Sequence, residues 1–275
     1  MYEILEKKAM SETVKLMKIK APLVAKKAIA GQFIILRIDE KGERIPLTIA
    51  DYDRNKGTVT VIFMEVGKTT KHLGTLNVGD FILNFAGPLG QPSEIEKYGT
   101  VVCIGGGVGI APLYPIIREL KKAGNYVISI LGARNEKLLM LEKEINEFSN
   151  EMFICTDDGS KGQKGFVSDV LQKLIDDGKK INVVWAIGPV IMMKVVANLT
   201  KKYDIKTVVS LNPIMVDGTG MCGGCRVSVG GETKFACVDG PEFDGHLVDF
   251  DNLMLRNRRF VCEEKEACNC AGVEI

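Results

Sequence analysis

The first 98 residues carry the apolar and polar pattern of short β-strands. Four runs rich in β-branched and aromatic residues are separated by Gly, Asp and Lys turns, and they span residues 13–19, 33–38, 58–66 and 81–85. One short helix is predicted near 69–76. Several short strands between regular turn signals predict a closed β-barrel over residues 1–98.

From residue 99 to residue 211 the pattern changes to alternating strands and helices. Apolar runs predict strands at 100–104, 126–131, 152–156, 182–187 and 207–211. Longer stretches between them predict helices at 111–123, 136–148, 166–177 and 190–203. Repeated βα units indicate a doubly wound parallel sheet, which binds ligands at the carboxyl ends of its strands.

The last quarter of the chain is less regular. Residues 212–248 are rich in Gly and Cys and too short for a core of their own, so we expect a metal to hold this segment. Residues 249–275 form a polar tail without periodicity, with Cys262, Cys268 and Cys270 near its end. These three cysteines could form a second metal site, contact a partner or lie in a disordered tail, and we favour the disordered tail.

Composition and charge exclude several functional classes. The 275 residues are 46% hydrophobic, which allows a sizeable core, and 36 Lys+Arg balance 35 Asp+Glu. This balance predicts neither nucleic-acid binding nor attraction to an anionic membrane. The uncharged run at 100–117 contains glycines and two prolines, which favours a buried strand and loop over a membrane-spanning helix. The acidic N-terminus does not resemble a signal peptide, so we expect a cytoplasmic protein.

The 8 cysteines are unevenly distributed. Cys103 and Cys155 lie singly in apolar runs, where a small buried hydrophobic residue is expected. The others follow residue 221. In a chain without a recognisable secretion signal, clustered cysteines indicate metal binding in a reducing compartment rather than disulfides.

Glycines crowd the turn after the first strand of the predicted parallel sheet. Gly105, Gly106, Gly107 and Gly109 precede Pro112, which suits the first turn of a helix. Glycines let the backbone approach a pyrophosphate, and a helix N-terminus supplies amides and partial positive charge. The loop departs from G-x-G-x-x-G because Pro112 replaces the third glycine. A tight turn without ligand is the alternative, but the glycine density favours nucleotide binding.

Two further loops follow later strands of the same sheet. Asp157 and Asp158 offer carboxylates that can bind a ribose diol and repel a 2′-phosphate, which favours NAD(H) over NADP(H). The alternative is a solvated turn with a helix cap, and Arg134 could instead meet a phosphate. Gly188 and Pro189 follow the next strand and are expected to face the same crevice.

Two segments of the predicted barrel suit a phosphate-bearing ligand, because each combines cations with hydroxyl groups near a strand end or helix start. They contain Arg44, Pro46, Leu47 and Thr48 in the first segment, and Gly67, Lys68, Thr69 and Thr70 in the second. The alternative for each is an ordinary surface turn.

The clearest metal-binding signal is a C-x-x-C pair. Cys222 and Cys225, with Cys237 further on, can bring three thiolates to one centre, and neighbouring glycines can direct amides at the sulfurs. A fourth ligand is missing. Asp217 can supply an oxygen, and His246 or a tail cysteine are the rivals. The glycine density favours a [2Fe–2S] cluster over structural zinc.

Together these motifs resemble the ferredoxin–NADP reductase superfamily over about residues 1–245. The R-x-P-[LFY]-[ST] flavin motif is matched from Arg44 to Thr48, and the G-K-x-T phosphate segment from Gly67 to Thr70. The G-G-G-x-G-x-A-P loop under the nicotinamide nucleotide is matched at 105–112, and the D-D-G loop at 157–159. Many relatives have a cysteine where this chain has Ile187. The resemblance implies a Greek-key FAD-binding barrel (1–98), an NAD(H)-binding α/β domain (99–211) and a small [2Fe–2S] domain (212–248), followed by the tail (249–275).

Within the superfamily, this chain resembles two groups of electron-transfer subunits. Dihydroorotate dehydrogenase subunits have four cysteines at this spacing, whereas this chain has Asp217 at the first position. With an aspartate at this position, the chain resembles the small subunits of NADH-dependent reduced ferredoxin:NADP oxidoreductases. This resemblance implies FAD, NAD(H) and one [2Fe–2S] cluster on three cysteines and Asp217.

The resemblance also implies a partner. We expect a larger iron–sulfur flavoprotein subunit that binds NADP(H) and ferredoxin and that exchanges electrons with this chain. No general acid or nucleophile is required, because the cofactors carry the chemistry. The alternatives are a dihydroorotate dehydrogenase partner, or a zinc-stabilised nucleotide-binding protein without redox activity.

Overall fold

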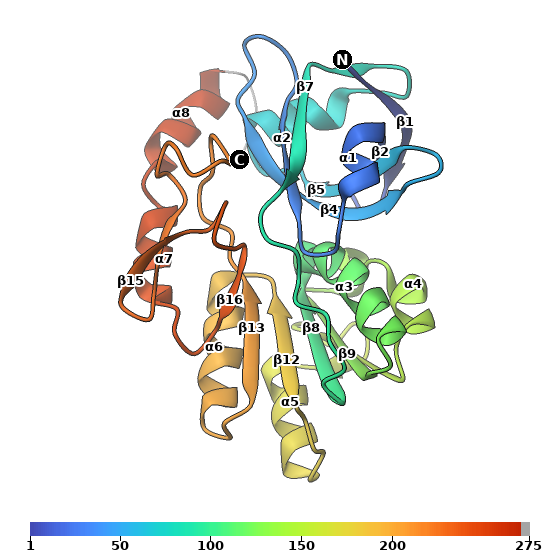
Figure 1. The fold of residues 1–275 in the computed structure, drawn as a ribbon, viewed down its shortest axis with the longest axis vertical. Helices are drawn as coiled ribbons and strands as arrows, with labels where there is room; N and C mark the ends of the chain where they lie inside the picture. Colours follow the sequence, from blue (N-terminus) through green and yellow to red (C-terminus); the bar gives the residue numbers. More distant parts are fainter. Residues whose placement is uncertain (271–275) are drawn as a thin grey trace.

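The computed structural model describes residues 1–270, with side chains as far as Glu266. Two seven-stranded sheets and a β-hairpin form its β-structure. In Figure 1 the first sheet lies above the second, and the C-terminal segment runs along one side of both. Within residues 1–270 no helix combines the length and the apolar character that crossing a bilayer requires.

The first sheet is an antiparallel barrel. It consists of β1 (Tyr2–Ala9), β2 (Val14–Lys20), β3 (Phe33–Arg37), β4 (Ile45–Asp53), β5 (Thr58–Met64), β6 (Phe81–Ile82) and β7 (Asn84–Leu89), in the order β6-β1-β2-β5-β4-β3-β7. One residue separates β6 from β7, yet β6 pairs with β1 and β7 pairs with β3, so this segment closes the sheet. The predicted closed barrel is therefore confirmed, and the strand order is that of a Greek key.

The barrel core explains which strands the sequence revealed. Ile19, Ile34, Val61 and Phe63 are at most 2% exposed and lie on strands with clear apolar patterns. Strand β1 carries no clear apolar pattern and was not predicted, because Ile4 is its one fully buried residue. Helix α1 (Pro22–Lys27) was not predicted either, whereas α2 (Lys68–Thr75) matches the predicted helix.

The second sheet has the order β11-β10-β9-β8-β12-β13-β16. Its parallel strands are β8 (Thr100–Gly106), β9 (Tyr126–Ala133), β10 (Glu151–Thr156), β11 (Gln163–Lys164), β12 (Val183–Ile187) and β13 (Lys206–Ser210). One face packs against α3 (Ile110–Lys122) and α4 (Glu142–Glu147), and the other against α5 (Val167–Asp176) and α6 (Val190–Lys201). This is the predicted doubly wound arrangement.

One predicted helix is interrupted. The range 136–148 contains a 3-10 turn, η2 (Glu136–Leu138), and then α4. Leu139, Met140 and Leu141 are buried between them, and Leu141 has a left-handed φ of 56°. Burial of this apolar run breaks the helix. A second 3-10 turn, η1 (Gly107–Gly109), joins β8 to α3.

The cysteine-rich segment shares the core of the second sheet. It contains β14 (Arg226–Val229), β15 (Glu232–Phe235) and β16 (Glu242–Asp244), and β16 pairs antiparallel with β13. Cys225, Val227 and Cys237 are buried in the hydrophobic cluster that includes α5 and α6 residues. Sheet pairing and apolar packing therefore hold this segment in addition to the metal that the sequence predicts.

The tail is helical, so the favoured expectation of disorder is wrong for residues 250–270. Asp249 caps α7 (Phe250–Asn257) by accepting a hydrogen bond from the Asn252 amide at 3.0 Å, and Phe250 and Leu253 are buried. These two contacts are too few to give a visible periodicity. The next helix, α8 (Val261–Cys270), lies against α2 of the barrel. Cys262 is exposed, and the side chains at 268 and 270 lie outside the described residues.

Candidate nucleotide and cluster sites

A cleft of about 1200 Å³ is lined by residues of the barrel and of the carboxyl edge of the parallel sheet. The chain leaves β8 toward β9 on one side and β12 lies on the other, so the cleft meets the sheet where the strand order reverses. Doubly wound sheets bind ligands at this point. The predicted site residues that line the cleft are Pro46, Leu47, Thr48, Thr70, Gly106, Gly107, Gly109, Pro112, Asp157, Gly188 and Pro189.

Three of the four glycines at the end of β8 and in the turn after it are required by close packing, because a side chain there would collide with neighbouring residues. A Cβ on Gly109 would lie 2.3 Å from the Ile187 carbonyl oxygen. Gly105 and Gly106 would likewise meet neighbours at 3.0 and 2.4 Å. Gly107 differs from these three, because its φ is +55° and no atom lies within 4 Å of its Cβ position. Gly107 is therefore the glycine whose freedom suits a ligand in the cleft.

The two aspartates after β10 have different environments. Asp158 Oδ1 accepts hydrogen bonds from the Ser160 hydroxyl at 2.6 Å and the Ser160 amide at 2.9 Å, which lower the pKa of Asp158. This is the turn-forming role that was the alternative. Asp157 is exposed in the cleft, which Arg134 also lines. Asp157 is thus the carboxylate of the pair that can reach a nucleotide.

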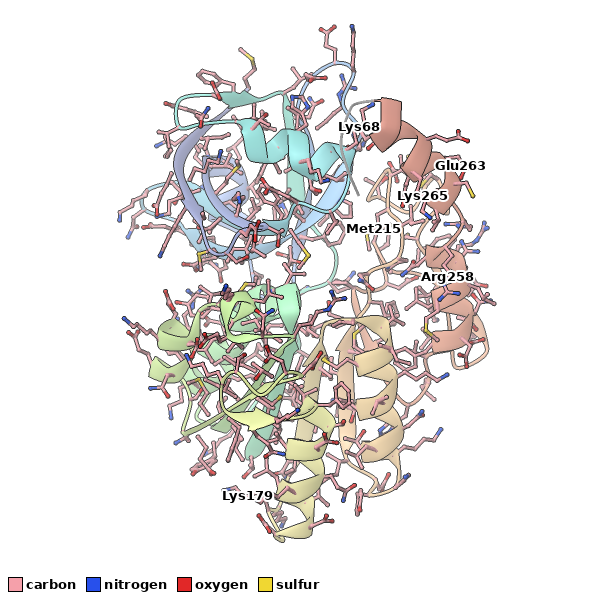
Figure 2. The ribbon with its side chains drawn as sticks, turned by 180° about the vertical axis from the view of Figure 1, so that it is seen from behind. Lys68, Lys179, Met215, Arg258, Glu263 and Lys265 are labelled. Carbon is pink, nitrogen blue, oxygen red and sulfur yellow. The ribbon has the colours of Figure 1, made fainter. Side chains whose placement is uncertain are left out.

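Hydrogen bonds fix the loop before α2. The Thr70 hydroxyl oxygen accepts the amides of Val66 and Gly67 at 3.0 and 3.1 Å. The neighbouring Thr69 is buried and donates its hydroxyl proton to the Glu43 carboxylate, so it has a structural role. Lys68, labelled in Figure 2, is exposed in the first turn of α2. The remaining amides and this cation suit a diphosphate.

Arg44 links the barrel to the cysteine-rich segment. Its Nε donates to the Val216 carbonyl at 2.9 Å, and its Nη2 donates to the Asp217 carbonyl at 3.1 Å. Arg44 does not line the cleft. The flavin motif predicted from the sequence is therefore tied to the loop that carries the predicted oxygen ligand.

Of the three cysteines of the predicted metal site, two are in contact, and the third differs from them in exposure. Cys225 and Cys237 are buried, and their sulfurs are 3.2 Å apart. Cys222 is exposed, and the Gly224 amide donates to its sulfur at 3.4 Å, which lowers the pKa of Cys222. Burial and the neighbouring Cys225 raise the pKa of Cys237 to about 12.

Asp217 belongs to the same loop. Its Oδ2 accepts hydrogen bonds from the Thr219 hydroxyl and amide at 2.7 and 2.8 Å and from the Met221 amide at 3.1 Å, and these bonds lower the pKa of Asp217. Its Oδ1 takes part in none of them. The Asp217 charge acts to raise the pKa values of Cys222 and Cys237, so the Asp217 carboxylate lies within electrostatic reach of both thiols.

The chemistry of these donors fits an iron–sulfur cluster. Among the described side chains, no three His, Cys, Asp or Glu residues are already arranged to bind a metal ion. The sulfurs of Cys225 and Cys237 are in contact, and the hydrogen bonds of Asp217 leave its Oδ1 unused. Gly218, Gly220 and Gly223 have positive φ, which gives this loop the backbone freedom to wrap around a cluster. The rival His246 instead contacts Thr200, with Nε2 3.0 Å from the hydroxyl oxygen, beside α6.

The cleft includes residues that no sequence motif revealed. Phe33 begins β3, Phe166 precedes α5, and Met215 lies just before Asp217. Met215 is only 6% exposed and lies between the barrel and the parallel sheet in Figure 2. Apolar residues at the ends of elements carry no local signal, so sequence reasoning had no means of finding them.

Three family models match the chain in the order of these structural parts. An oxidoreductase FAD-binding domain matches residues 1–93, an oxidoreductase NAD-binding domain matches 103–198, and the iron–sulfur cluster binding domain of dihydroorotate dehydrogenase B matches 212–249. Fold and site thus define a ferredoxin reductase-like oxidoreductase with FAD, NAD(H) and an iron–sulfur cluster as cofactors.

Two curated relatives show to which family within this class the chain belongs. A Thermotoga maritima homolog of the dihydroorotate dehydrogenase B (NAD(+)) electron transfer subunit is 50% identical over 96% of this chain and 93% of that protein. The corresponding subunit of Desulforamulus reducens is 34% identical over 84% and 91%. The chain belongs to this family of electron transfer subunits and their homologues.

A solved structure is similar over nearly the whole chain. It is a chain from the structure of an NADH-dependent reduced ferredoxin-NADP oxidoreductase, studied for flavin-based electron bifurcation. Sequence identity is 48% and the TM-score is 0.93, and the match covers 98% of this chain and 97% of that one. The likeness therefore includes the helical tail beyond the three matched domains.

Proposed function

We propose that the chain is the FAD-, NAD(H)- and [2Fe–2S]-binding subunit of an NADH-dependent ferredoxin:NADP+ oxidoreductase. In this role it exchanges electrons between NAD(H) and a larger iron–sulfur flavoprotein that binds NADP(H) and ferredoxin, in the cytoplasm. The likeness to the oxidoreductase chain along nearly its whole length carries the proposal. Asp217, at the position where dihydroorotate dehydrogenase subunits have a cysteine, supports it.

In the proposed subunit the two sides of the cleft hold the two nucleotides. Pro46, Leu47 and Thr48 of β4 line the barrel side, and Lys68 with the loop fixed by Thr70 would bind the FAD diphosphate. When bound, FAD would supply the chemistry that converts two-electron hydride transfer into single-electron transfer. This chain's residues would hold and orient the two nucleotides in the cleft.

On the opposite side, the backbone at Gly107 allows close approach of NAD(H), and Asp157 would accept the adenosine ribose hydroxyls. Gly188 and Pro189 complete this side beside η1. A carboxylate at the ribose disfavours the 2′-phosphate of NADP(H), which supports NADH as the nucleotide of this subunit.

The proposed cluster ligands are Asp217, Cys222, Cys225 and Cys237. An oxygen ligand is harder and less strongly electron-donating than a thiolate, so it changes the reduction potential of the cluster relative to a four-thiolate site. The proposed domains are 1–98 for FAD, 99–211 for NAD(H) and 212–248 for the cluster, with 249–275 as a C-terminal extension.

The second candidate is the electron transfer subunit of an NAD-dependent dihydroorotate dehydrogenase. The names of the sequence relatives and of the matched cluster domain favour it. The matched domain is an iron–sulfur domain, which argues against the zinc-stabilised alternative. The two candidates share cofactors and differ in the partner.

Anaerobic purification of the chain from its native cell tests the proposal. One FAD, two irons and a co-purifying flavoprotein that reduces NADP+ with ferredoxin are the expected result. The same cofactors with a dihydroorotate-oxidising partner would establish the second candidate. Zinc without flavin would refute both.

A further inference from the structure

The C-terminal helices reach back to the loop of the C-x-x-C pair. Arg256, near the end of α7, donates from Nε to the Arg226 carbonyl at 3.0 Å and from Nη2 to the Gly224 carbonyl at 3.4 Å. Arg259 donates from Nη2 to the same Gly224 carbonyl at 3.0 Å. Two guanidinium groups from the tail therefore converge on one carbonyl inside the C-x-x-C loop.

Gly224 is held from both sides by these contacts. Its amide donates to the Cys222 sulfur at 3.4 Å, while its carbonyl accepts from the two arginines. The Gly224 carbonyl belongs to the peptide unit that joins Gly224 to Cys225, so the two arginines fix the backbone between the amide that reaches the Cys222 sulfur and the next cysteine. Hydrogen bonds to cluster sulfurs are one of the means by which a protein tunes an iron–sulfur centre.

A third arginine adds to the positive charge. A Cβ on Gly223 would lie 3.2 Å from Nη1 of Arg226, so this guanidinium packs over the loop. Burial, and then the charges of Arg259 and Arg226, lower the pKa of Arg256. In the part of the chain that the structure describes, none of these three arginines has a carboxylate partner in an ion pair. Three crowded like charges indicate that an anion belongs at this loop.

We propose that Arg256 and Arg259 are positioning residues that hold the C-x-x-C loop around the cluster, and that together with Arg226 they stabilise its reduced, more negative form. The inference rests on the proposed function, because it requires the cluster. The family model for the cluster domain ends at residue 249, so Arg256 and Arg259 act on the cluster from outside the matched domain, whereas Arg226 lies within it.

Substitution of the arginines in the full chain, produced with its partner, tests this inference. We compare Arg256→Gln, Arg259→Gln and the double variant with Arg258→Gln, which changes an exposed arginine of the same turn (Figure 2) that donates no hydrogen bond to the loop. The midpoint potential is measured by redox titration with EPR detection, and cluster stability by the rate of iron release to a chelator.

The double variant is expected to shift the ratio of reduced to oxidised cluster about tenfold toward the oxidised form, which is ~59 mV for one electron. Iron release is expected to be several-fold faster, because the loop loses its two donors. Arg258→Gln should match the unaltered protein. Lysine at 256 and 259 keeps the charge but loses the planar fork, so it should preserve the potential and still speed iron release.

An unchanged potential in the double variant would overturn the electrostatic role, and an unchanged rate of iron release would overturn the positioning role. If the double variant does not fold, the lysine variants and the single variants decide by the same two readouts. Absence of a [2Fe–2S] signal in the unaltered protein would instead refute the proposed function, and this inference with it.

Discussion

Gly109→Ala should separate the two loops that form the nucleotide side of the cleft. Gly109 has φ −64°, which alanine adopts freely, so the backbone at this position is not strained by the substitution. The obstacle is the Ile187 carbonyl oxygen, 2.3 Å from the position of the new Cβ, with the Ile187 carbonyl carbon and Gly188 Cα at 2.7 Å. All three neighbours are backbone atoms at the end of β12 and cannot rotate away.

The size of the effect follows from these distances. Ordinary contact begins at 3.4 Å, so the carbonyl must move by 3.4 minus 2.3, or about 1.1 Å. A misplacement of about 1 Å can cost roughly 100-fold in rate, which is about 2.7 kcal/mol of barrier. We expect kcat/KM for NADH to fall by about that factor. Overpacking should also lower the free energy of unfolding by about 1–3 kcal/mol.

Stopped-flow reduction of the bound flavin by NADH is the assay, with FAD and iron content measured in parallel. Gly178→Ala is the control, because Gly178 has φ +78° and no atom within 4 Å of its Cβ position, and it lies in the turn after α5. It should lose stability without losing NADH kinetics. NADH kinetics within twofold of the unaltered protein for Gly109→Ala would refute the argument that displacement of the Ile187 carbonyl disturbs an NAD(H) site at this edge of the sheet.

Three other substitutions have expected outcomes. Thr70→Val removes the acceptor for the Gly67 amide and should weaken FAD binding about fivefold, equivalent to ~1 kcal/mol for a lost cap, in a fluorescence titration. Asp217→Cys replaces the oxygen ligand with a thiolate and should lower the midpoint potential and slow iron loss, both measured on the purified chain. Glu242→Gln tests a half-buried residue whose carboxyl group accepts hydrogen bonds from Ser93 at 2.7 Å and Trp185 at 3.2 Å, and whose pKa is raised above 4.5 by desolvation. The stabilising effect of the protonated form is present below pH 4.5 and is lost as the pH rises through the raised folded-state pKa. Over this pH range the free energy of unfolding of Glu242→Gln should rise relative to that of the unaltered protein, by up to ~1.4 kcal/mol per pH unit. Urea unfolding at several pH values measures this difference.

Each of these three substitutions has a control variant and an outcome that would contradict the reasoning. Thr70→Ser keeps the hydroxyl and should bind FAD normally, so equal weakening by Ser and Val would contradict the hydrogen-bond argument. Asp217→Asn should speed iron loss, and an unaltered potential in Asp217→Cys would argue against Asp217 as a ligand. For Glu242, the exposed Glu94→Gln is the control, and a pH-independent stability difference would show that Glu242 is not protonated in the fold.

Local patterns predicted the parallel sheet because its strands are buried on both faces. Val101, Val102 and Ile104 of β8 are fully buried, and such a run is visible without knowing its neighbours. In β4 the pattern is weak, since only Ile49 and Ala50 of its residues are buried. In α7 two buried residues make the whole contact with the core. Elements with few buried positions give too little periodicity to be found from sequence.

The sequence by itself determined the order of the flavin, nicotinamide and cluster motifs, since each depends on a short stretch with fixed chemistry. Only the tertiary structure decided that Arg44 reaches the Asp217 carbonyl, and that Arg256 and Arg259 reach Gly224 from the tail. It also decided that the end of β12 leaves no room for a side chain at position 109. These contacts join residues far apart in the chain, and they arise where separate elements pack together, so no local pattern of hydrophobic and polar residues encodes them.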